Sequence, residues 1–214
     1  MPPETIPASK FRRALLAWYR EAHRRLPWRE TKDPYRVWLS EIMLQQTRVA
    51  AALPYYHRFL ERFPTVEALA RASEQDLLAA WSGLGYYARA RSMHSAARSI
   101  VRMGAFPRDY EAIRGLPGVG DYTAAAIASL CFDLPHAVVD GNVLRVVSRL
   151  TNDAGDIRSA RVKARIAAEA RRLLDPQEPA LFNQALMELG ALVCLPRSPE
   201  CARCPVRSHC RARK

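Results

Sequence analysis

The sequence of 214 residues has no long apolar run and little strand-like alternation. No window reaches the roughly 18 consecutive apolar residues of a membrane-spanning helix, which excludes a transmembrane protein. Few stretches alternate with period two and β-branched runs are short, so a sheet-based fold is also excluded. The first residues, MPPETIPASKFRR, lack the apolar segment of a secretory signal. We therefore expect a cytoplasmic protein.

Acidic residues are scarce beside basic ones: 21 Asp and Glu face 33 Lys and Arg, for a net charge of +12. Such an excess favours a polyanionic partner, with an inert basic surface as the alternative. The arginines are scattered along many elements, unlike the single basic face of a membrane-binding helix. A hydrophobic content of 49% permits a core and excludes a disordered chain.

Helical periodicity recurs along almost the whole chain and predicts an all-α fold. Proline, glycine and capping residues mark most of the breaks. The predicted helices cover residues 9–24, a segment from Pro34, 49–62, a segment from near 65, 73–83, about 86–103, a segment from near 121, 142–150, 159–174 and 179–192.

The centre of the chain holds a glycine-punctuated turn, LPGVG, directly before a helix that begins near Asp121. Glycine lets the backbone bend sharply and bring its N–H groups close to another surface. The unpaired N–H groups of a first helical turn bind anions, and a nucleic-acid phosphate is the obvious candidate. The predicted DNA-binding residues of this turn are Leu116, Gly118, Val119 and Gly120. An ordinary glycine-rich connection is the alternative.

Two acidic residues stand in unusual settings. Glu41 interrupts the apolar stretch WLSEIMLQQ, where burial would raise its pKa as a general acid requires. Asp140 opens the next helical pattern, where an N-cap is the alternative to a role toward the bound DNA. With the rest of the chain considered, we interpret it as a residue facing a sugar rather than as a helix cap. Such a pair suits cleavage of an N-glycosidic bond, because one acid protonates the leaving base and the other stabilises the cationic sugar. A surface position is the alternative for Glu41.

A base inside duplex DNA must be flipped out before such chemistry. Gln45, Gln46 and the pair Tyr86–Tyr87 are suitable for reading a base edge or inserting a flat ring into the stack. Core packing is the alternative for the tyrosines, and we expect it for at least one of them.

Four of the five cysteines lie near the end of the chain, with the spacing C-x6-C-x2-C-x5-C. They are Cys194, Cys201, Cys204 and Cys210. Four thiolates from one short loop hold either zinc or an iron–sulfur cluster, and uneven spacing around a single C-x-x-C favours [4Fe–4S]. Cys131, in an apolar run, is predicted to be a core thiol.

The turn, the Asp-Gly pair and the cysteine pattern together resemble the helix-hairpin-helix DNA glycosylase superfamily over essentially the whole chain. Longer motifs are similar to the A/G-specific adenine glycosylase (MutY) family within it. These motifs are LPWRE (26–30), WLSEIMLQQTRV (38–49), GLGYYARAR (83–91), VVDGNVLRV (138–146) and FNQALMELGA (182–191).

The resemblance implies that Glu41 protonates adenine at N7 and that Asp140 stabilises the oxocarbenium ion. It also implies that Asn142 and Arg29 assist at the site. Tyr122 stands where endonuclease III carries a lysine that forms a Schiff base. A tyrosine cannot form that imine, so a monofunctional glycosylase is expected.

The resemblance further implies that Tyr86 and Gln46 probe the opened stack and that the four cysteines hold [4Fe–4S]. The implied fold is a six-helix barrel over 30–136 and a cluster domain over 1–29 and 137–214, with the active site between them. The implied protein is a monomer in the bacterial cytoplasm, associated with the nucleoid, that binds double-stranded DNA containing a mismatch or damaged base.

One departure concerns substrate choice. The adenine glycosylases usually continue into a Nudix-like C-terminal domain that recognises 8-oxoguanine, whereas this sequence ends at Lys214. We therefore expect weaker discrimination of 8-oxoguanine from guanine. Short relatives that remove thymine or uracil opposite guanine are the alternative enzyme, since they share the tyrosine of Tyr122. A zinc-stabilised DNA-binding module or a scaffold with a basic surface is the non-enzymatic alternative.

Overall fold

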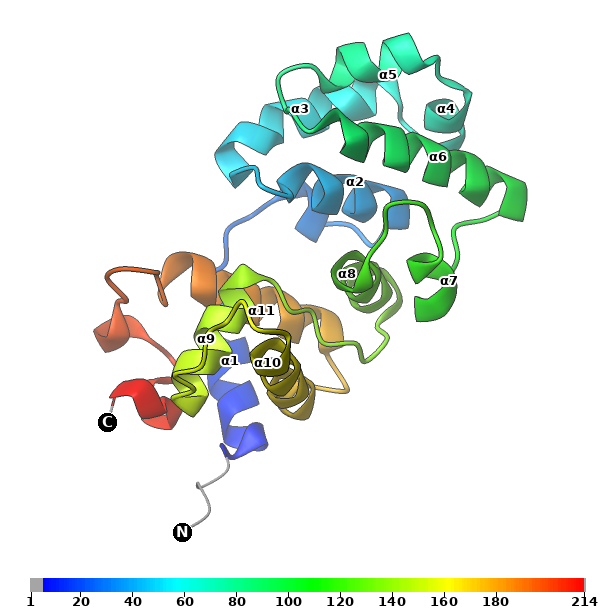
Figure 1. Cartoon of the computed structure of the whole chain (residues 1–214). Coiled ribbons are helices and arrows are strands. Elements are labelled where there is room, and N and C mark those ends of the chain that lie inside the picture. The colour runs from blue at the N-terminus through cyan, green and yellow to red at the C-terminus, as the bar shows by residue number, and fades with distance from the viewer. Residues whose placement is uncertain (1–5, 214) are drawn as a thin grey trace. The chain divides into compact units, whose positions relative to one another are not determined.

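The computed structural model describes residues 6–213, and all regular elements in that range are helices (Figure 1). This confirms the predicted all-α class. None of these helices combines the length and apolar character that crossing a bilayer requires. The α-helices are α1 (Ala8–Ala22), α2 (Pro34–Leu44), α3 (Val49–Arg62), α4 (Val66–Arg71), α5 (Glu74–Trp81), α6 (Tyr87–Met103), α7 (Tyr110–Arg114), α8 (Asp121–Phe132), α9 (Gly141–Thr151), α10 (Ala160–Leu173) and α11 (Pro179–Leu192). Short 3₁₀ helices are η1 (Pro27–Arg29), η2 (Cys201–Arg203), η3 (Arg207–His209) and η4 (Arg211–Arg213).

Local capping explains why several helices begin where the sequence predicts. The Asp33 carboxylate accepts a hydrogen bond from the backbone N–H of Tyr35 at 2.9 Å, directly before the proline that opens α2. Ser73 accepts from the backbone N–H of Asp76 at 3.0 Å, and its hydroxyl donates to that side chain at 2.7 Å. These contacts make Ser73 the N-cap of α5.

Residues Leu26–Phe132 form one compact unit, here the central unit, which contains α2 to α8. Helix α8 is apolar on all sides, and its residues from Thr123 to Cys131 are all buried. Helices α2 and α7 pack against α8, while α4 and α5 pack against α6. Cys131 is buried as predicted. Helix α8 is therefore the core helix of this unit, and it carries the segment that follows the glycine turn.

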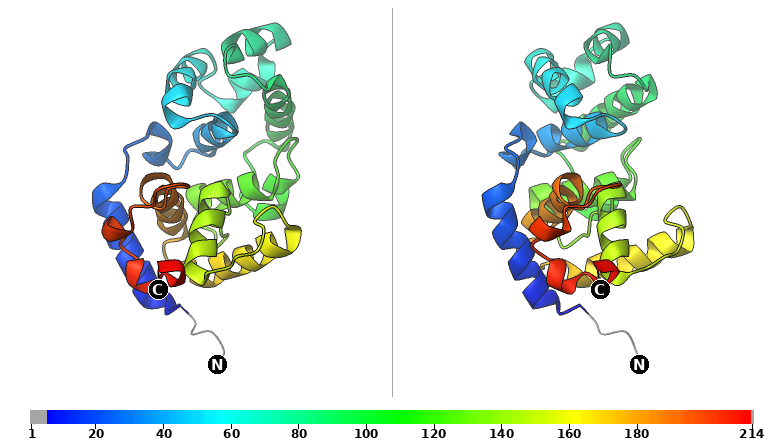
Figure 2. Two further views of the ribbon diagram at one scale, coloured as in Figure 1. Left: turned by 60° about the vertical axis from the view of Figure 1, so that its left-hand side comes forward. Right: turned by 90° about the vertical axis from the view of Figure 1, so that its left-hand side faces the viewer.

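The described residues 6–25 and 133–213 belong to the second compact unit, here the terminal unit. Both views in Figure 2 place α1 beside the C-terminal 3₁₀ turns, and the ring of Phe11 lies 6.3 Å from those of both Phe182 and His209. Helix α11 packs on α1 and α9. The two ends of the chain thus share one hydrophobic core. The domain limits predicted from the sequence fall a few residues later and stay a prediction.

The end of α1 is tied to α11 by a buried ion pair. The side chain of Glu188 is fully buried and accepts hydrogen bonds from the backbone N–H of Arg24 at 2.9 Å and from its guanidinium at 2.6 Å. The hydrogen bond with Glu188 raises the pKa of Arg24. Because a buried charge without its partner is costly, this contact holds the last turn of α1 in place.

Candidate active site

Glu41 lies in the second half of α2 and is only 6% exposed. Its Oε2 atom accepts a hydrogen bond of 2.7 Å from the hydroxyl of Tyr122, in the first turn of α8. The predicted burial of Glu41 is confirmed, and a surface position is excluded. A buried carboxyl that a hydroxyl holds in one orientation is suited to storing and delivering a proton.

The glycine turn joins α7 to α8 as the predicted helix-hairpin-helix. Gly118 has φ 75°, and a Cβ at this position would lie 2.5 Å from the Cβ of Ser92 on α6, so only glycine fits. The side chains of Leu116 and Val119 are buried, at 2% and 8% exposure. Their backbone N–H groups donate within the turn, to the carbonyls of Ile113 at 3.2 Å and Leu116 at 3.1 Å. An anion site at the start of α8 would therefore use other N–H groups of the turn.

The residues predicted to probe a base stack lie on two loops of the central unit. Gln45 is half-buried and ends α2, whereas Gln46 is exposed with φ 61°. Tyr86 precedes α6, is 64% exposed and has φ 49°. Tyr87 is also exposed, at 40%, so the expectation that one of the tyrosines packs in the core is wrong. Both rings are exposed because the buried face of α6 begins only at Ala90.

Asp140 is the N-cap of α9, and the interpretation that it is not a helix cap is wrong. Its Oδ1 atom accepts from the backbone N–H of Val143 at 2.7 Å, and Oδ2 accepts from the side-chain amide of Asn142 at 2.7 Å. Burial raises the pKa of Asp140, although these hydrogen bonds act in the opposite direction. The cap fixes the orientation of the carboxylate, which is compatible with a second role toward a cationic sugar.

A hydrogen-bond chain leads from Asp140 toward the cysteines through two residues of α9. The guanidinium of Arg145 donates to the side-chain carbonyl of Asn142 at 2.8 Å and to the backbone carbonyl of Cys194 at 2.8 Å. It also donates to the carbonyl of Gly190 at 2.9 Å. A Cβ on Gly190 would lie 2.6 Å from the Cβ of Asn142, so α9 and α11 are in close contact here. The cysteine loop and Asp140 therefore share one rigid support.

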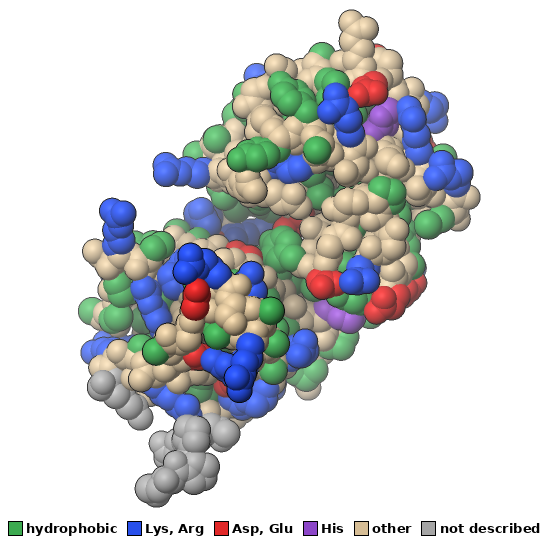
Figure 3. Space-filling view, viewed as in Figure 1, with side chains coloured by type: hydrophobic (Ala, Val, Ile, Leu, Met, Phe, Trp, Pro, Cys, Tyr) green, Lys and Arg blue, Asp and Glu red, His purple; other side chains and the backbone are tan. Residues whose placement is uncertain are grey.

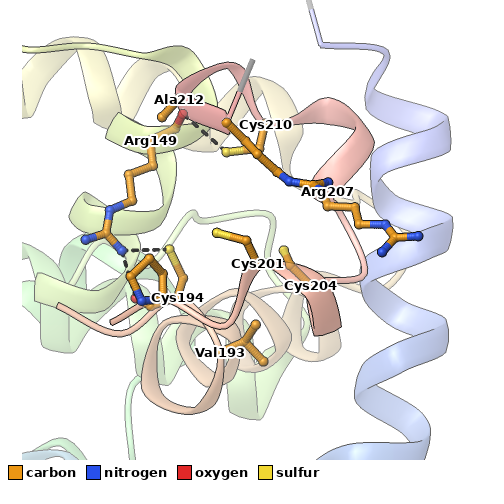
Figure 4. A pocket seen from close by; sticks show the side chains of 10 residues that line it. Arg149, Val193, Cys194, Cys201, Cys204, Arg207, Cys210 and Ala212 are labelled. Carbon is orange, nitrogen blue, oxygen red and sulfur yellow. Dashed lines mark hydrogen bonds between the residues drawn. The ribbon is translucent and has the colours of Figure 1, made fainter. Parts of the chain in front are cut away.

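The four clustered cysteines line one cavity of about 310 Å³ in the terminal unit (Figure 4). None of them forms a disulfide. Arg149 borders the cavity and donates to the Sγ of Cys194 at 3.3 Å. Burial raises the pKa of Cys204 to about 11 and also raises the pKa of Cys210. Such thiols become thiolates only when a positive group binds beside them.

Zinc and an iron–sulfur cluster are the two inorganic groups that four cysteines of this spacing could hold. Among the described residues, no group of three or more His, Cys, Asp or Glu side chains is arranged to hold a metal ion. Four sulfurs around one zinc lie only about 3.8 Å apart, from a Zn–S bond of about 2.3 Å. Four thiols that border one cavity of about 310 Å³, with an N–H donor to the sulfur of Cys194, are a donor set that either zinc or an iron–sulfur cluster would use.

Several contributors to the site were not predicted from the sequence. Asn183 on α11 is buried, accepts from the backbone N–H of Val138 at 3.0 Å and donates to the carbonyl of His136 at 2.8 Å. It thereby holds the segment that leads into Asp140. The two adjacent amides Asn183 and Gln184 in the otherwise mostly apolar stretch FNQALMELGA were the available signal. Arg29, predicted to assist, is half-buried at the end of η1.

Lys and Arg side chains are spread over many elements of the face in view (Figure 3). Some are neutralised in exposed ion pairs, such as Arg62–Asp76 at 2.8 Å and Arg165–Asp153 at 2.8 Å. Exposed pairs contribute little stability. These pairs are already balanced in the net charge of +12, which would be the source of any long-range attraction for polyanions.

Comparison with known proteins identifies relatives over nearly the whole chain. The chain is 47% identical to the adenine DNA glycosylase of Rattus norvegicus, over 94% of this chain and 41% of the relative. It is 46% identical to that of Homo sapiens, over 95% and 39% respectively. It is 39% identical to that of Buchnera aphidicola, over 94% and 58%. The predicted resemblance is confirmed, and the chain spans about two fifths to three fifths of the length of these relatives.

Solved structures show the same fold. A thermostable thymine-DNA glycosylase superposes with a TM-score of 0.86 at 28% identity, covering 96% of both chains. Endonuclease III in a non-covalent DNA complex superposes with a TM-score of 0.78 at 22% identity, covering 97% of both, which shows the fold alone. The model of the HhH-GPD superfamily base excision DNA repair proteins matches residues 39–172. With its hairpin, its buried Glu41 and more than half of its length matched, this chain belongs to the HhH-GPD superfamily of base excision DNA repair proteins.

Proposed function

We propose that this chain is a monofunctional DNA glycosylase that flips adenine out of a duplex and hydrolyses its N-glycosidic bond. The adenine is mispaired with guanine or 8-oxoguanine. The observation that carries the proposal is the buried carboxyl of Glu41, oriented by the hydroxyl of Tyr122 at 2.7 Å. Relatives named adenine DNA glycosylase, at 46% and 47% identity, support adenine as the base.

In the proposed reaction Glu41 donates a proton to N7 of the flipped adenine. The bond between the base and the sugar then breaks, and its electron pair leaves with the base. Asp140 faces the resulting oxocarbenium ion, and its carboxylate is held for this role by Val143 and Asn142. Water adds to the cationic carbon and loses a proton to complete the hydrolysis. Tyr122 has no amine, so no covalent imine forms and the DNA strand stays intact.

We further propose that the four cysteines hold a [4Fe–4S] cluster. Bound as thiolates, they would fix the C-terminal turns, and the cluster would supply structural support rather than bond-breaking chemistry. The N–H donor of Arg149 would stabilise the sulfur of Cys194. Iron and sulfide analysis of purified protein, with a visible absorption spectrum, tests this assignment. Zinc alone would contradict it and would favour a zinc-stabilised DNA-binding module.

The proposed partner is double-stranded DNA that contains a mismatch or a damaged base. The net charge of +12 and the hairpin before α8 support a phosphate-contacting surface. We propose that the chain works as a monomer on the nucleoid of the bacterial cytoplasm. Light scattering of the free chain, and imaging of a fluorescent fusion over the nucleoid, test these two points.

A second candidate function has one specific observation in its favour. The thymine-DNA glycosylase matches 96% of this chain with a TM-score of 0.86, so removal of thymine opposite guanine fits the same fold. The identity of 28% is lower than that of the adenine-specific relatives. Adenine therefore remains the first choice.

Single-turnover excision from a panel of duplexes distinguishes the candidates. The panel contains A:8-oxoguanine, A:G, T:G and U:G pairs in the same flanking sequence. We expect adenine release from the first two and none from the others. Release of thymine or uracil without adenine would replace the first proposal by the second. Binding without any lesion preference at matched salt would favour a scaffold with a basic surface.

A further inference from the structure

Arg89, in the first turn of α6, joins two loops of the central unit that lie far apart in sequence. Its Nη1 atom donates to the backbone carbonyls of Ile42 at 2.8 Å and Gln45 at 2.6 Å, where α2 ends. Its Nη2 atom donates to the carbonyls of Leu84 at 3.3 Å and Gly85 at 3.2 Å, directly before α6. One guanidinium thus satisfies carbonyls of both loops at once.

In both loops, the residue that follows the carbonyls bound by Arg89 has an unusual backbone conformation. Gln46 follows Gln45 with φ 61°, and Tyr86 follows Gly85 with φ 49°. Residues other than glycine adopt this left-handed region only where the surroundings hold them there. Both side chains are exposed, and the guanidinium carbon of Arg89 lies 5.5 Å from the centroid of the Tyr86 ring. The two strained, exposed residues therefore depend on the same half-buried cation.

Arg89 also lies next to the hairpin. It lines a cavity of about 180 Å³ together with Gln45 and with Pro117 and Gly118 of the glycine turn. The side chain is only partly exposed, and its position is fixed by a fork of hydrogen bonds rather than by a counter-ion. A lysine in its place would have one ammonium and could not reproduce the planar fork.

We propose that Arg89 is a positioning residue that locks Gln46 and Tyr86 into one rigid wedge for opening the base stack. The proposal rests on the proposed glycosylase function, because it assigns the wedge to that reaction. Arg89 itself does not touch the base. It sets the backbone conformation of the two residues that do, so that no ordering of these loops is needed when DNA binds.

The test compares two identical charge-conserving changes on the same helix, Arg89→Lys and Arg91→Lys. Arg91 is a suitable control because it forms an exposed ion pair with Glu74 at 2.7 Å outside the two loops. Each variant is assayed on an A:G duplex and on a duplex whose target adenine faces an abasic-site analogue. A 2-aminopurine beside the target reports unstacking through its fluorescence. Thermal melting confirms that each variant is folded.

We expect Arg89→Lys to slow excision from the A:G duplex by roughly 10- to 100-fold, because a small misplacement of a positioning group has that effect. Its fluorescence rise on binding should shrink as well. On the pre-opened duplex the loss should be much smaller, since an unpaired base needs less work to leave the stack. Arg91→Lys should behave like wild type on both. Equal losses on both duplexes, or an unchanged fluorescence rise, would overturn the proposal.

A second pair of variants covers the case in which Arg89→Lys does not fold. Gln46→Gly and Tyr86→Gly remove the two side chains and release the left-handed strain while keeping Arg89 itself, and they should show the same selective loss on the paired duplex. Equal behaviour on both duplexes would again overturn the proposal. If wild type releases no adenine at all, the proposed function fails, while the fluorescence comparison of the two lysine variants still decides the role of Arg89.

Discussion

The two candidate catalytic acids are held in opposite ways. Glu41 lies inside a helix, and its hydroxyl partner Tyr122 is 81 residues away in the sequence. Asp140 lies at a helix start, and its partners Asn142 and Val143 are its own near neighbours. The contact that orients Glu41 joins two helices and forms only in the folded chain. The N–H donors to Asp140 are local, favour its ionised form and orient its oxygens.

This difference teaches that Glu41 depends on the tertiary structure for its orientation, whereas Asp140 is oriented by its own helix. The N–H donors and the charge of Arg145 counteract the effect of burial at Asp140, even though its pKa remains raised overall. A general acid must deliver a proton in the step where an anionic stabiliser must be charged. Substitutions that neutralise each acid should therefore have distinct signatures.

The largest effect is expected for Glu41→Gln. The amide keeps an acceptor for the hydroxyl of Tyr122 but cannot donate an acidic proton, so excision should fall by roughly 10³-fold while DNA binding persists. Single-turnover excision and binding titrations measure the two quantities. Glu74→Gln, at an exposed ion pair, is the matched control. Excision near the wild-type rate would show that Glu41 is not the acid.

A somewhat smaller loss is expected for Asp140→Asn. Asparagine caps helices as well as aspartate, so α9 should remain intact and the melting temperature should change little. Loss of the negative charge should nevertheless slow excision by roughly 10²-fold, as for other groups that stabilise charge in a transition state. If the melting temperature drops strongly and the folded protein still excises adenine at the wild-type rate, Asp140 acts only as a helix cap.

Arg145→Met should lower both the stability of the fold and the rate of excision. The change removes the donors to Asn142, Gly190 and Cys194, leaving buried acceptors that cost about 1–3 kcal/mol. Excision should fall by about 10-fold because Asn142 loses its orientation. Chemical denaturation and single-turnover assays measure the two effects. Arg158→Met, whose side chain is 88% exposed, provides a control in the same unit.

The smallest effect concerns the pH dependence of stability. The folded pKa of Asp140 lies above its ordinary value of 3.8, so the native state keeps a proton that the unfolded state has lost. The free energy of unfolding should therefore fall as pH rises from 3.8 through the folded pKa. In the Asp140→Asn variant, the free energy of unfolding should therefore decline less over this pH range. Urea titrations of both proteins across this window, at constant salt, measure the difference, and superimposable profiles would contradict it.

Much of the fold could be predicted because its causes are local. Helices begin at Pro34 and after Ser73 as predicted, since each start depends on side chains within three or four residues. The same locality makes Asp140 a helix cap, a role that the sequence interpretation set aside. The exposure of Tyr86 and Tyr87 was harder to predict, because it depends on where the buried face of α6 begins.

By itself the sequence determined the helical class, the hairpin with its glycines, the cysteine spacing and the identity of the two acids, because these follow from residue type and short-range spacing. Only the tertiary structure decided which groups support them. Tyr122 reaches Glu41 across 81 residues, Arg89 joins two loops through backbone carbonyls, and Arg145 connects Asn142 to the cysteine loop. Hydrogen bonds from long side chains to distant carbonyls leave no periodic signal, so they appear only when the chain is folded.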